Sequence, residues 1–209
     1  MASTEVHNGL HVACKGLSHS FRSKKIFTLS DTIIPAGAEC LVQGRNGSGK
    51  STLGRIVSGE LTPTSGQITW TREGQELDAE TIGHSTHRVS PATALHPELT
   101  ISELIAFQGQ FRTWRNDPLD LLERANMRQH LSASFRTLSS GMQQRVKLAM
   151  ALASDSGLIV LDEPCANLDE QGKAWYRECV QAIKGSTTLV ICSNNRPEDY
   201  IAPDIALEL

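Results

Sequence analysis

The stretch that decides this fold is Gly44-Arg45-Asn46-Gly47-Ser48-Gly49-Lys50-Ser51-Thr52, which reads G-x-x-x-x-G-K-S followed by threonine. This pattern is typical of a phosphate-binding loop, or P-loop. Its glycines let successive backbone N–H groups turn toward one centre, where an anion can bind. Lys50 can reach the β- and γ-phosphates of a nucleotide, and the Ser51 hydroxyl can ligate Mg²⁺. The residue types therefore predict that 44–52 binds a nucleotide.

The segments on either side of the loop fit this interpretation. Residues 39–43 form a short, mostly apolar run, which is typical of a buried strand. Residues 51–58 are predicted to form a helix, so the positive end of the helix dipole would face the same anion. The alternative is a Gly/Ser-rich turn that matches by chance. The order strand, loop, helix argues against that alternative.

The composition of the 209 residues is that of an ordinary globular protein. The formal net charge is −3, so charge gives no indication of direct nucleic-acid binding. The five cysteines form no C-x-x-C pair, which favours reduced, buried thiols. No apolar run approaches the roughly 18 residues needed to cross a bilayer. We expect a cytoplasmic protein that attaches to a membrane only through a partner.

Hydrophobic periodicity places strands first and then alternates strands with helices. Strands are predicted at 10–14, 26–34, 39–43, 67–71, 157–161 and 187–192, and helices at 51–58, from a capping box at 100–103, and at 118–127, 138–153 and 170–184. Between 72 and 97 the pattern is weak. The order predicts an α/β fold, with a mostly parallel sheet covered by helices on both faces. We interpret 1–209 as one domain, with about 90–155 as an inserted helical subdomain.

Two histidines, His84 and His87, have the spacing H-x-x-H inside this weak region. A metal site would need further ligands, and the sequence suggests none nearby. We therefore interpret both as solvated loop histidines.

A second constellation follows the apolar run 157–161, which ends in Asp162-Glu163. Ligands bind at the carboxyl ends of strands in open parallel sheets. Asp162 is expected to hold Mg²⁺ through water, and Glu163 to act on the attacking water as a general base. The alternative is a pair of solvated acids at a strand end, which the P-loop makes less favoured.

A third group, Leu138-Ser139-Ser140-Gly141-Met142, precedes the long helix predicted to end near 153. Hydroxyls and free N–H groups at a helix start can bind a second anion. An ordinary N-cap is the alternative, and the residues alone leave both open.

With these motifs in order, the chain resembles the nucleotide-binding subunits of ATP-binding-cassette (ABC) transporters over essentially its whole length. Residues 44–51 match the family's Walker A motif, 158–162 match Walker B, and 167–169 match the D-loop. Residues 138–142 look like the L-S-G-G-Q signature. The resemblance implies a P-loop NTPase core with an antiparallel β lobe and an inserted helical lobe. It also implies site roles for Glu163 as the catalytic glutamate, Phe21 as the aromatic that stacks on adenine, Ser139, Ser140, Gly141 and Met142 as the signature, and Asp169 in the D-loop. For Phe21, a core position is the alternative.

Several positions depart from the family pattern. The signature has Ser140 for its first glycine and Met142 for its glutamine. Pro91 or Ser90 stands where the Q-loop glutamine is expected. Asn194 stands in place of the switch histidine, and asparagine can donate a hydrogen bond but cannot carry a titratable proton. Nucleotide binding and dimerisation are therefore safer expectations than fast hydrolysis.

The function that the resemblance implies is ATP binding and hydrolysis, with Mg²⁺, coupled to a separate transmembrane permease at the inner face of the membrane. Two copies would sandwich two ATP molecules, each between one P-loop and the other copy's signature. A nucleotide-gated regulatory module with slow hydrolysis, or a mechanical ABC ATPase acting on nucleic acid or ribosomes, are the alternatives. The length of the chain and residues 98–104 also resemble, more weakly, the ATPase subunit of the haem exporter in cytochrome c maturation.

Overall fold

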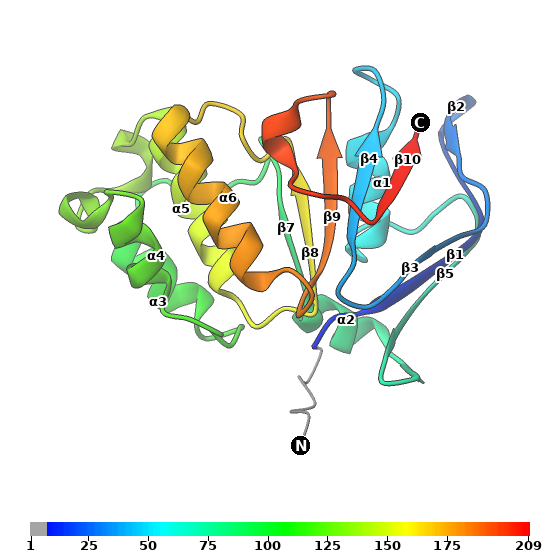
Figure 1. Ribbon diagram of the computed structural model, residues 1–209, viewed down its shortest axis with the longest axis horizontal. Helices are drawn as coiled ribbons and strands as arrows, with labels where there is room; N and C mark the ends of the chain where they lie inside the picture. Colours follow the sequence, from blue (N-terminus) through cyan, green and yellow to red (C-terminus); the bar gives the residue numbers. More distant parts are fainter. Residues whose placement is uncertain (1–7) are drawn as a thin grey trace.

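The computed structural model describes residues 8–209, which form two β-sheets with helices between and beside them (Figure 1). The strands are β1 (His11–Phe21), β2 (Lys24–Thr28), β3 (Thr32–Ile34), β4 (Glu39–Gln43), β5 (Ser65–Arg72), β6 (Gln75–Glu76), β7 (Thr86–Val89), β8 (Leu158–Asp162), β9 (Thr188–Ser193) and β10 (Ile205–Glu208). The α-helices are α1 (Lys50–Val57), α2 (Ala79–Ser85), α3 (Ile101–Gln108), α4 (Pro118–Arg124), α5 (Ser140–Ala153) and α6 (Glu170–Ile183).

The core sheet is parallel, with the strand order β10-β4-β9-β8-β7. The second sheet is antiparallel, with the order β2-β1-β5-β6, and β3 pairs with β1. The predicted α/β fold with a mostly parallel core and an antiparallel β lobe is confirmed.

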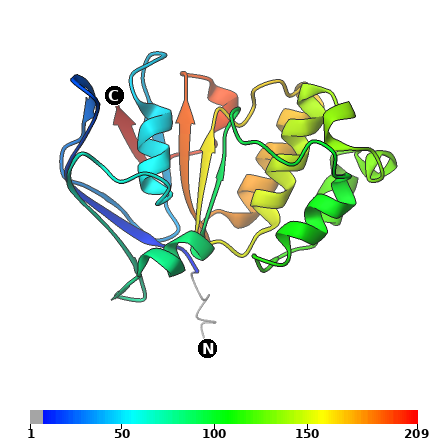
Figure 2. The ribbon, with the colours of Figure 1, turned by 180° about the vertical axis from the view of Figure 1, so that it is seen from behind.

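Along each core strand, successive side chains point to opposite faces of the parallel sheet. One face carries Leu41, Leu161 and Ile191 into a buried cluster that α3, α4, α5 and α6 complete. The other face carries Val42 and Val160 into a cluster with α1 and the antiparallel sheet. Figure 2 shows α1 held between the two sheets. Coverage on both faces explains why these strands read as continuous apolar runs.

In the sequence, α3, α4 and α5 come between β7 and β8, although these two strands are hydrogen-bonded neighbours in the parallel sheet. The chain therefore leaves the sheet after Val89 and returns to it at Leu158. The predicted capping box at the start of α3 is confirmed, since Thr100 accepts from the Glu103 N–H and Glu103 accepts from the Thr100 N–H. Among residues 8–209, no helix combines the length and the apolar character that a bilayer crossing requires.

Sequence periodicity missed or merged several short elements. The single strand expected at 26–34 is divided into β2 and β3, because residues 29–31 between them are not in a strand. The weak region after residue 72 contains α2, which begins where Asp78 accepts a hydrogen bond from the Thr81 N–H at 2.8 Å. It also contains β7, whose four residues are too few to show a period. The last strand, β10, pairs with β4 and was not expected.

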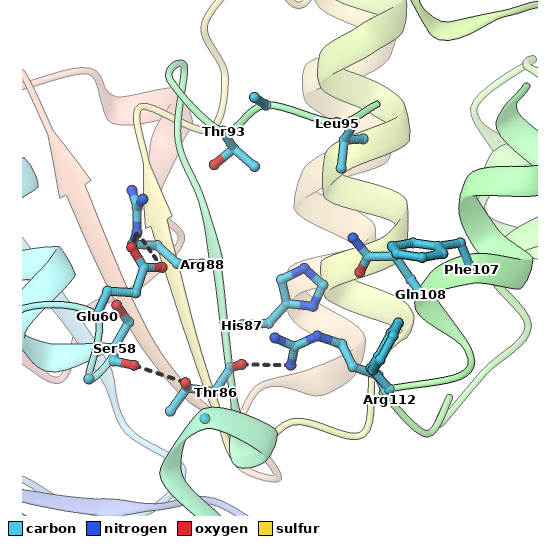
Figure 3. Close-up of a pocket in the computed structure, with 14 residues that line it drawn as sticks. Ser58, Glu60, Thr86, His87, Arg88, Thr93, Leu95, Phe107, Gln108 and Arg112 are labelled. Carbon is cyan, nitrogen blue, oxygen red and sulfur yellow. Dashed lines mark hydrogen bonds and ion pairs between the residues drawn. The ribbon is translucent and has the colours of Figure 1, made fainter. Parts of the chain in front are cut away.

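The interpretation of His87 as a solvated loop residue is wrong. His87 lies in β7 and is 8% exposed, whereas His84 is exposed near the end of α2. Figure 3 shows the His87 ring beside Arg112, whose Nη1 donates to the Thr86 carbonyl at 2.7 Å. Burial, together with the smaller effect of the Arg112 guanidinium, lowers the pKa of His87 to about 3. His87 is therefore neutral in the folded protein at pH 7.

This buried histidine predicts a loss of stability in acid. In the unfolded chain its pKa is about 6.5, so the unfolded state takes up the proton first. The free energy of unfolding then falls as pH drops below the unfolded pKa toward the folded value of about 3. His87→Gln should remove about 2 kcal/mol of the loss between about pH 7.5 and about pH 5. Urea unfolding at the two pH values measures the loss.

His84→Gln is the matched control, because His84 is exposed and its removal should leave the acid loss as it is in the wild type. An equal acid loss in His87→Gln and in the wild type would show that the folded protein accommodates a charged His87.

Candidate functional site

The loop between β4 and α1 closes around its own lysine. Lys50 is the first residue of α1, and its Nζ donates to the carbonyls of Gly44 at 2.8 Å and Arg45 at 3.0 Å. Gly49 precedes the helix with φ at 107°, and a Cβ there would lie 2.8 Å from the Ile26 side chain. Glycine is therefore required where the loop turns into the helix.

A cavity opens over this loop and reaches the end of β8. It is lined by Ile26, Asn46, Gly47, Gly49, Lys50, Ser51, Thr52 and Glu163. The Oγ of Ser48 is buried and has no hydrogen-bond partner among the described residues. The buried Lys50 cation, the unpartnered Ser48 hydroxyl and the N-terminus of the eight-residue helix α1 form a donor set that fits a phosphate. The structure thus brings the loop residues of 44–52 together with Glu163.

Asp162, the last residue of β8, lies beside Ser51. It is 5% exposed, and its burial raises the pKa of the carboxyl group. A hydrogen bond from the Ser51 side chain opposes that rise, as do the charges of Arg88 and Lys50. Hydroxyl and carboxylate oxygens are ligands that suit Mg²⁺. Within residues 8–209, no three His, Cys, Asp or Glu side chains are grouped so that they could hold a metal ion, so Mg²⁺ would need phosphate and water oxygens to complete its shell.

Glu163 and Asn194 meet at the ends of β8 and β9. Glu163 has a left-handed backbone conformation, with φ at 48°, and its N–H donates to the Cys192 carbonyl at 2.9 Å. The amide nitrogen of Asn194 donates to the Glu163 carboxylate. The amide oxygen of Asn194 is buried, without a partner in the part of the chain that the structure describes. Asn194 therefore positions Glu163, and the strained backbone at Glu163 is typical of functional sites.

Asp199 ties the two loops that carry Glu163 and Asn194. Its carboxylate accepts a hydrogen bond from the Ser193 hydroxyl at 2.6 Å and another from the Cys165 N–H at 3.1 Å. Ser193 directly precedes Asn194, and Cys165 follows Glu163 by two residues. Asp199 is fully buried, so this bridge is shielded from water.

The signature residues form a second cavity with the D-loop. Ser139 is the N-cap of α5, and its hydroxyl accepts from the Met142 N–H at 3.3 Å. A Cβ on Gly141 would lie 2.6 Å from the Asn167 carbonyl oxygen, so only glycine lets these segments approach. The cavity is lined by Ser139, Ser140, Gly141, Met142, Arg145, Asn167 and Asp169.

Asp169 closes this second cavity as the N-cap of α6. It accepts from the Gly172 N–H at 2.8 Å and pairs with the Arg145 guanidinium at 2.5 Å. The Gly172 N–H and Arg145 together lower the pKa of Asp169. The predicted signature and D-loop residues are therefore neighbours, although 24 positions separate Arg145 from Asp169.

Some residues lie differently from expectation. Phe21 is 48% exposed and stands edge-on to His19 with ring centroids 4.7 Å apart, so the alternative of a core position is excluded, and its role as the aromatic that stacks on adenine stays a prediction. Ile26, which no motif singled out, lines the cavity over the loop. Ser90 and Pro91 line a further cavity with Ser51, Asp162 and Glu163. Ser90 turns inward there, and its hydroxyl lies 3.1 Å from the Thr93 hydroxyl.

Comparisons with known proteins agree with these motifs. The ABC transporter family matches residues 29–166. The cytochrome c biogenesis ATP-binding export protein CcmA of Chelativorans sp. (strain BNC1) is 28% identical and covers 90% of this chain and 93% of its own length. The energy-coupling factor transporter ATP-binding protein EcfA1 of Mycoplasma mobile is 29% identical, over 96% of this chain and 77% of its own.

A solved structure shares the fold. The "Dimeric Structure of MJ0796, a Bacterial ABC Transporter Cassette" superposes with a TM-score of 0.79 at 21% identity, over 94% of both chains. The P-loop α/β architecture is thus that of a cassette.

Lys50 is the side chain whose loss should most reduce nucleotide affinity. Its Nζ would exchange the two loop carbonyls for phosphate oxygens, a charge-assisted contact. Lys50→Ala should weaken ATP binding by about 1 to 3 kcal/mol. Equilibrium titration with a fluorescent ATP analogue measures the change. Lys24→Ala, at an exposed position of β2, is the control for loss of a positive charge. Unchanged affinity in Lys50→Ala would contradict the assignment of the loop.

Proposed function

This chain belongs to the ABC transporter family, and we propose that the site at residues 44–52, 162–163 and 194 binds and hydrolyses ATP with Mg²⁺. The protein is an ATPase subunit that energises a transporter through a separate membrane-spanning permease. We place it on the cytoplasmic side, at the inner face of the membrane. The observation that carries the proposal is the meeting of Lys50, Ser51 and Glu163 in one cavity, with Asp162 beside Ser51.

The nucleotide contacts follow from the loop. Successive N–H groups of 44–52 and the N-terminus of α1 would bind the β- and γ-phosphates, with Lys50 as the cation. Ser51 and Asp162 would hold Mg²⁺, which neutralises charge on the phosphates when bound. The adenine ring would stack on the exposed Phe21 ring, with Ile26 lining the cavity on the way to the loop.

The hydrolytic water would be oriented by Glu163. The Asn194 amide holds the Glu163 carboxylate, and Asp199 links the loop that carries Glu163 to the loop that carries Asn194. Asn194 cannot shuttle a proton, and Pro91 offers neither a polar side chain nor an N–H. We therefore expect slow hydrolysis by the isolated subunit, with little dependence on pH near the ordinary histidine pKa of about 6.5.

The signature cavity is assigned to the nucleotide of a second copy. It offers free N–H groups and two serine hydroxyls at the start of α5. Among the described residues, none lines both this cavity and the cavity over the loop. Each chain thus has one of each kind, and two chains related by a two-fold axis can complete two sites.

The two relatives are named for different transporters, and their sequence identities to this chain, 28% and 29%, are nearly equal. The transported molecule is therefore not carried over from either of them.

Glu163→Gln tests the chemistry. Glutamine keeps an oxygen that can accept from Asn194, so the loop should hold its shape, but it cannot take a proton. ATP binding should persist, and turnover should fall by about a hundredfold or more. Phosphate release and nucleotide titration measure the two effects. A variant as active as the wild type would place the base elsewhere.

Ser140→Glu tests the shared site. Ser140 is exposed in the first turn of α5, where a carboxylate favours the helix, so folding should be unaffected. The same charge would repel a phosphate that approaches from another chain. In the Glu163→Gln background, ATP with Mg²⁺ should shift the protein from monomer to dimer, and Ser140→Glu should abolish this shift.

Sedimentation velocity with and without ATP measures the association, and Ser140→Ala is the matched control that should still dimerise. Equal dimerisation of the glutamate variant would exclude the signature from the interface.

A further inference from the structure

The Arg88 side chain lies on the face of the parallel sheet that α1 covers. In the register of β7 with β8, Arg88 lies opposite Val160. Val160 faces α1, since a Cβ on Gly54 would lie 3.2 Å from its Cγ1. Side chains two apart share a face, so Asp162 and Arg88 both face α1. His87 and Val89 face the other way.

One cavity brings Arg88 to the reacting groups. Its lining includes Ser51, Arg88, Pro91, Asp162 and Glu163. The Arg88 side chain is 14% exposed, and its charge acts to lower the pKa of Asp162. Pro91 lies in the same lining without a polar side chain, and of the residues that β7 and the loop after it contribute to this lining, Arg88 is the charged one; Arg55 of α1 is a second cation in the lining.

A carboxylate holds Arg88 by only one of its nitrogens. The Nε donates to both carboxylate oxygens of Glu60 at 2.9 Å. In the portion of the chain that the structure describes, the two terminal nitrogens make no hydrogen bond. Figure 3 shows them on the far side of the guanidinium from Glu60. A planar guanidinium with free terminal N–H groups is suited to bidentate binding of phosphate.

We propose that Arg88 donates its terminal N–H groups to the terminal phosphate of bound ATP, while Glu60 tethers the Nε. This inference rests on the proposed function of the site. Lys50 meets the phosphates from the loop, and Arg88 meets the last phosphate from β7. Arg88 is thus a cation for the developing charge, on the side where Pro91 provides none. ADP lacks that phosphate, so the contact distinguishes ATP from ADP.

The test compares ATP and ADP affinities in Mg²⁺, using fluorescent analogues of both nucleotides and the full chain. Arg88→Met should weaken ATP binding about tenfold or more and leave ADP binding unchanged. Arg88→Lys should retain part of the preference for ATP, because it keeps the charge but not the fork. Lys50→Ala should weaken the binding of both nucleotides, because the lysine also reaches the β-phosphate.

Glu60→Gln separates a phosphate contact from an ion pair that only supports the fold. Glutamine keeps an acceptor for Nε and removes the competing charge, so ATP affinity should rise or stay the same. If Glu60→Gln and Arg88→Met instead weaken both nucleotides alike, the pair is structural and the inference is wrong.

A wild-type protein that binds neither nucleotide would remove the proposed function itself. A wild-type protein that binds both, with an Arg88→Met variant that keeps the wild-type ratio of affinities, would overturn the inference alone. Thermal unfolding of each variant shows whether it is folded, and Arg88→Lys carries the comparison if the methionine variant is not.

Discussion

The structure depends on one electrostatic constraint at the carboxyl edge of the parallel sheet. Two carboxylates, Asp162 and Glu163, lie where the negative charge of phosphates must also be accommodated. The opposing charge comes from Lys50, from the N–H groups of the loop and from the start of α1. In a medium of low dielectric, such charges are stable only when they are paired or hydrogen-bonded. A bound Mg²⁺ would complete the balance.

Burial on both sheet faces fixes this edge in place. Because α1 lies between the two sheets and α5 and α6 cover the opposite face, the strands β4, β8 and β9 cannot slip in register without moving apolar residues out of their clusters. The loops that follow β4, β8 and β9 are therefore anchored at a fixed position. The Asp199 bridge extends this anchoring to Glu163 and Asn194, which lie outside the strands. Catalytic loops need such support because small displacements of reacting groups are costly.

The sequence predicted the elements whose physical signals are local. The strand 39–43 agrees with β4, because a short apolar run between turn residues is distinctive. The capping box at Thr100 was recognisable because both of its hydrogen bonds lie within four residues. The meeting of Lys50 with Glu163 was predicted from motif order, since parallel strands bring their carboxyl ends to one edge.

Other features depend on long-range packing and left no local signal. The strand β7 has a polar side chain on each face, His87 near Arg112 on one and Arg88 paired with Glu60 on the other, so its sequence shows no apolar pattern. The strand β10 is defined by its pairing with β4, far away in the sequence. The requirement for glycine at 141 comes from the carbonyl of Asn167 on another segment. Ile26 reaches the loop cavity only through the pairing of β1 with β2.

The most direct measurement of a site shared between two chains is complementation between two inactive variants. Lys50→Ala damages the loop and Ser140→Glu damages the signature, so each variant alone should have lost ATP turnover. In a mixed dimer, the loop of the Ser140→Glu chain would meet the intact signature of the Lys50→Ala chain. We predict that mixing the two purified variants restores turnover. Turnover that stays at the level of the separate variants, when sedimentation shows that mixed dimers form, would contradict the shared site.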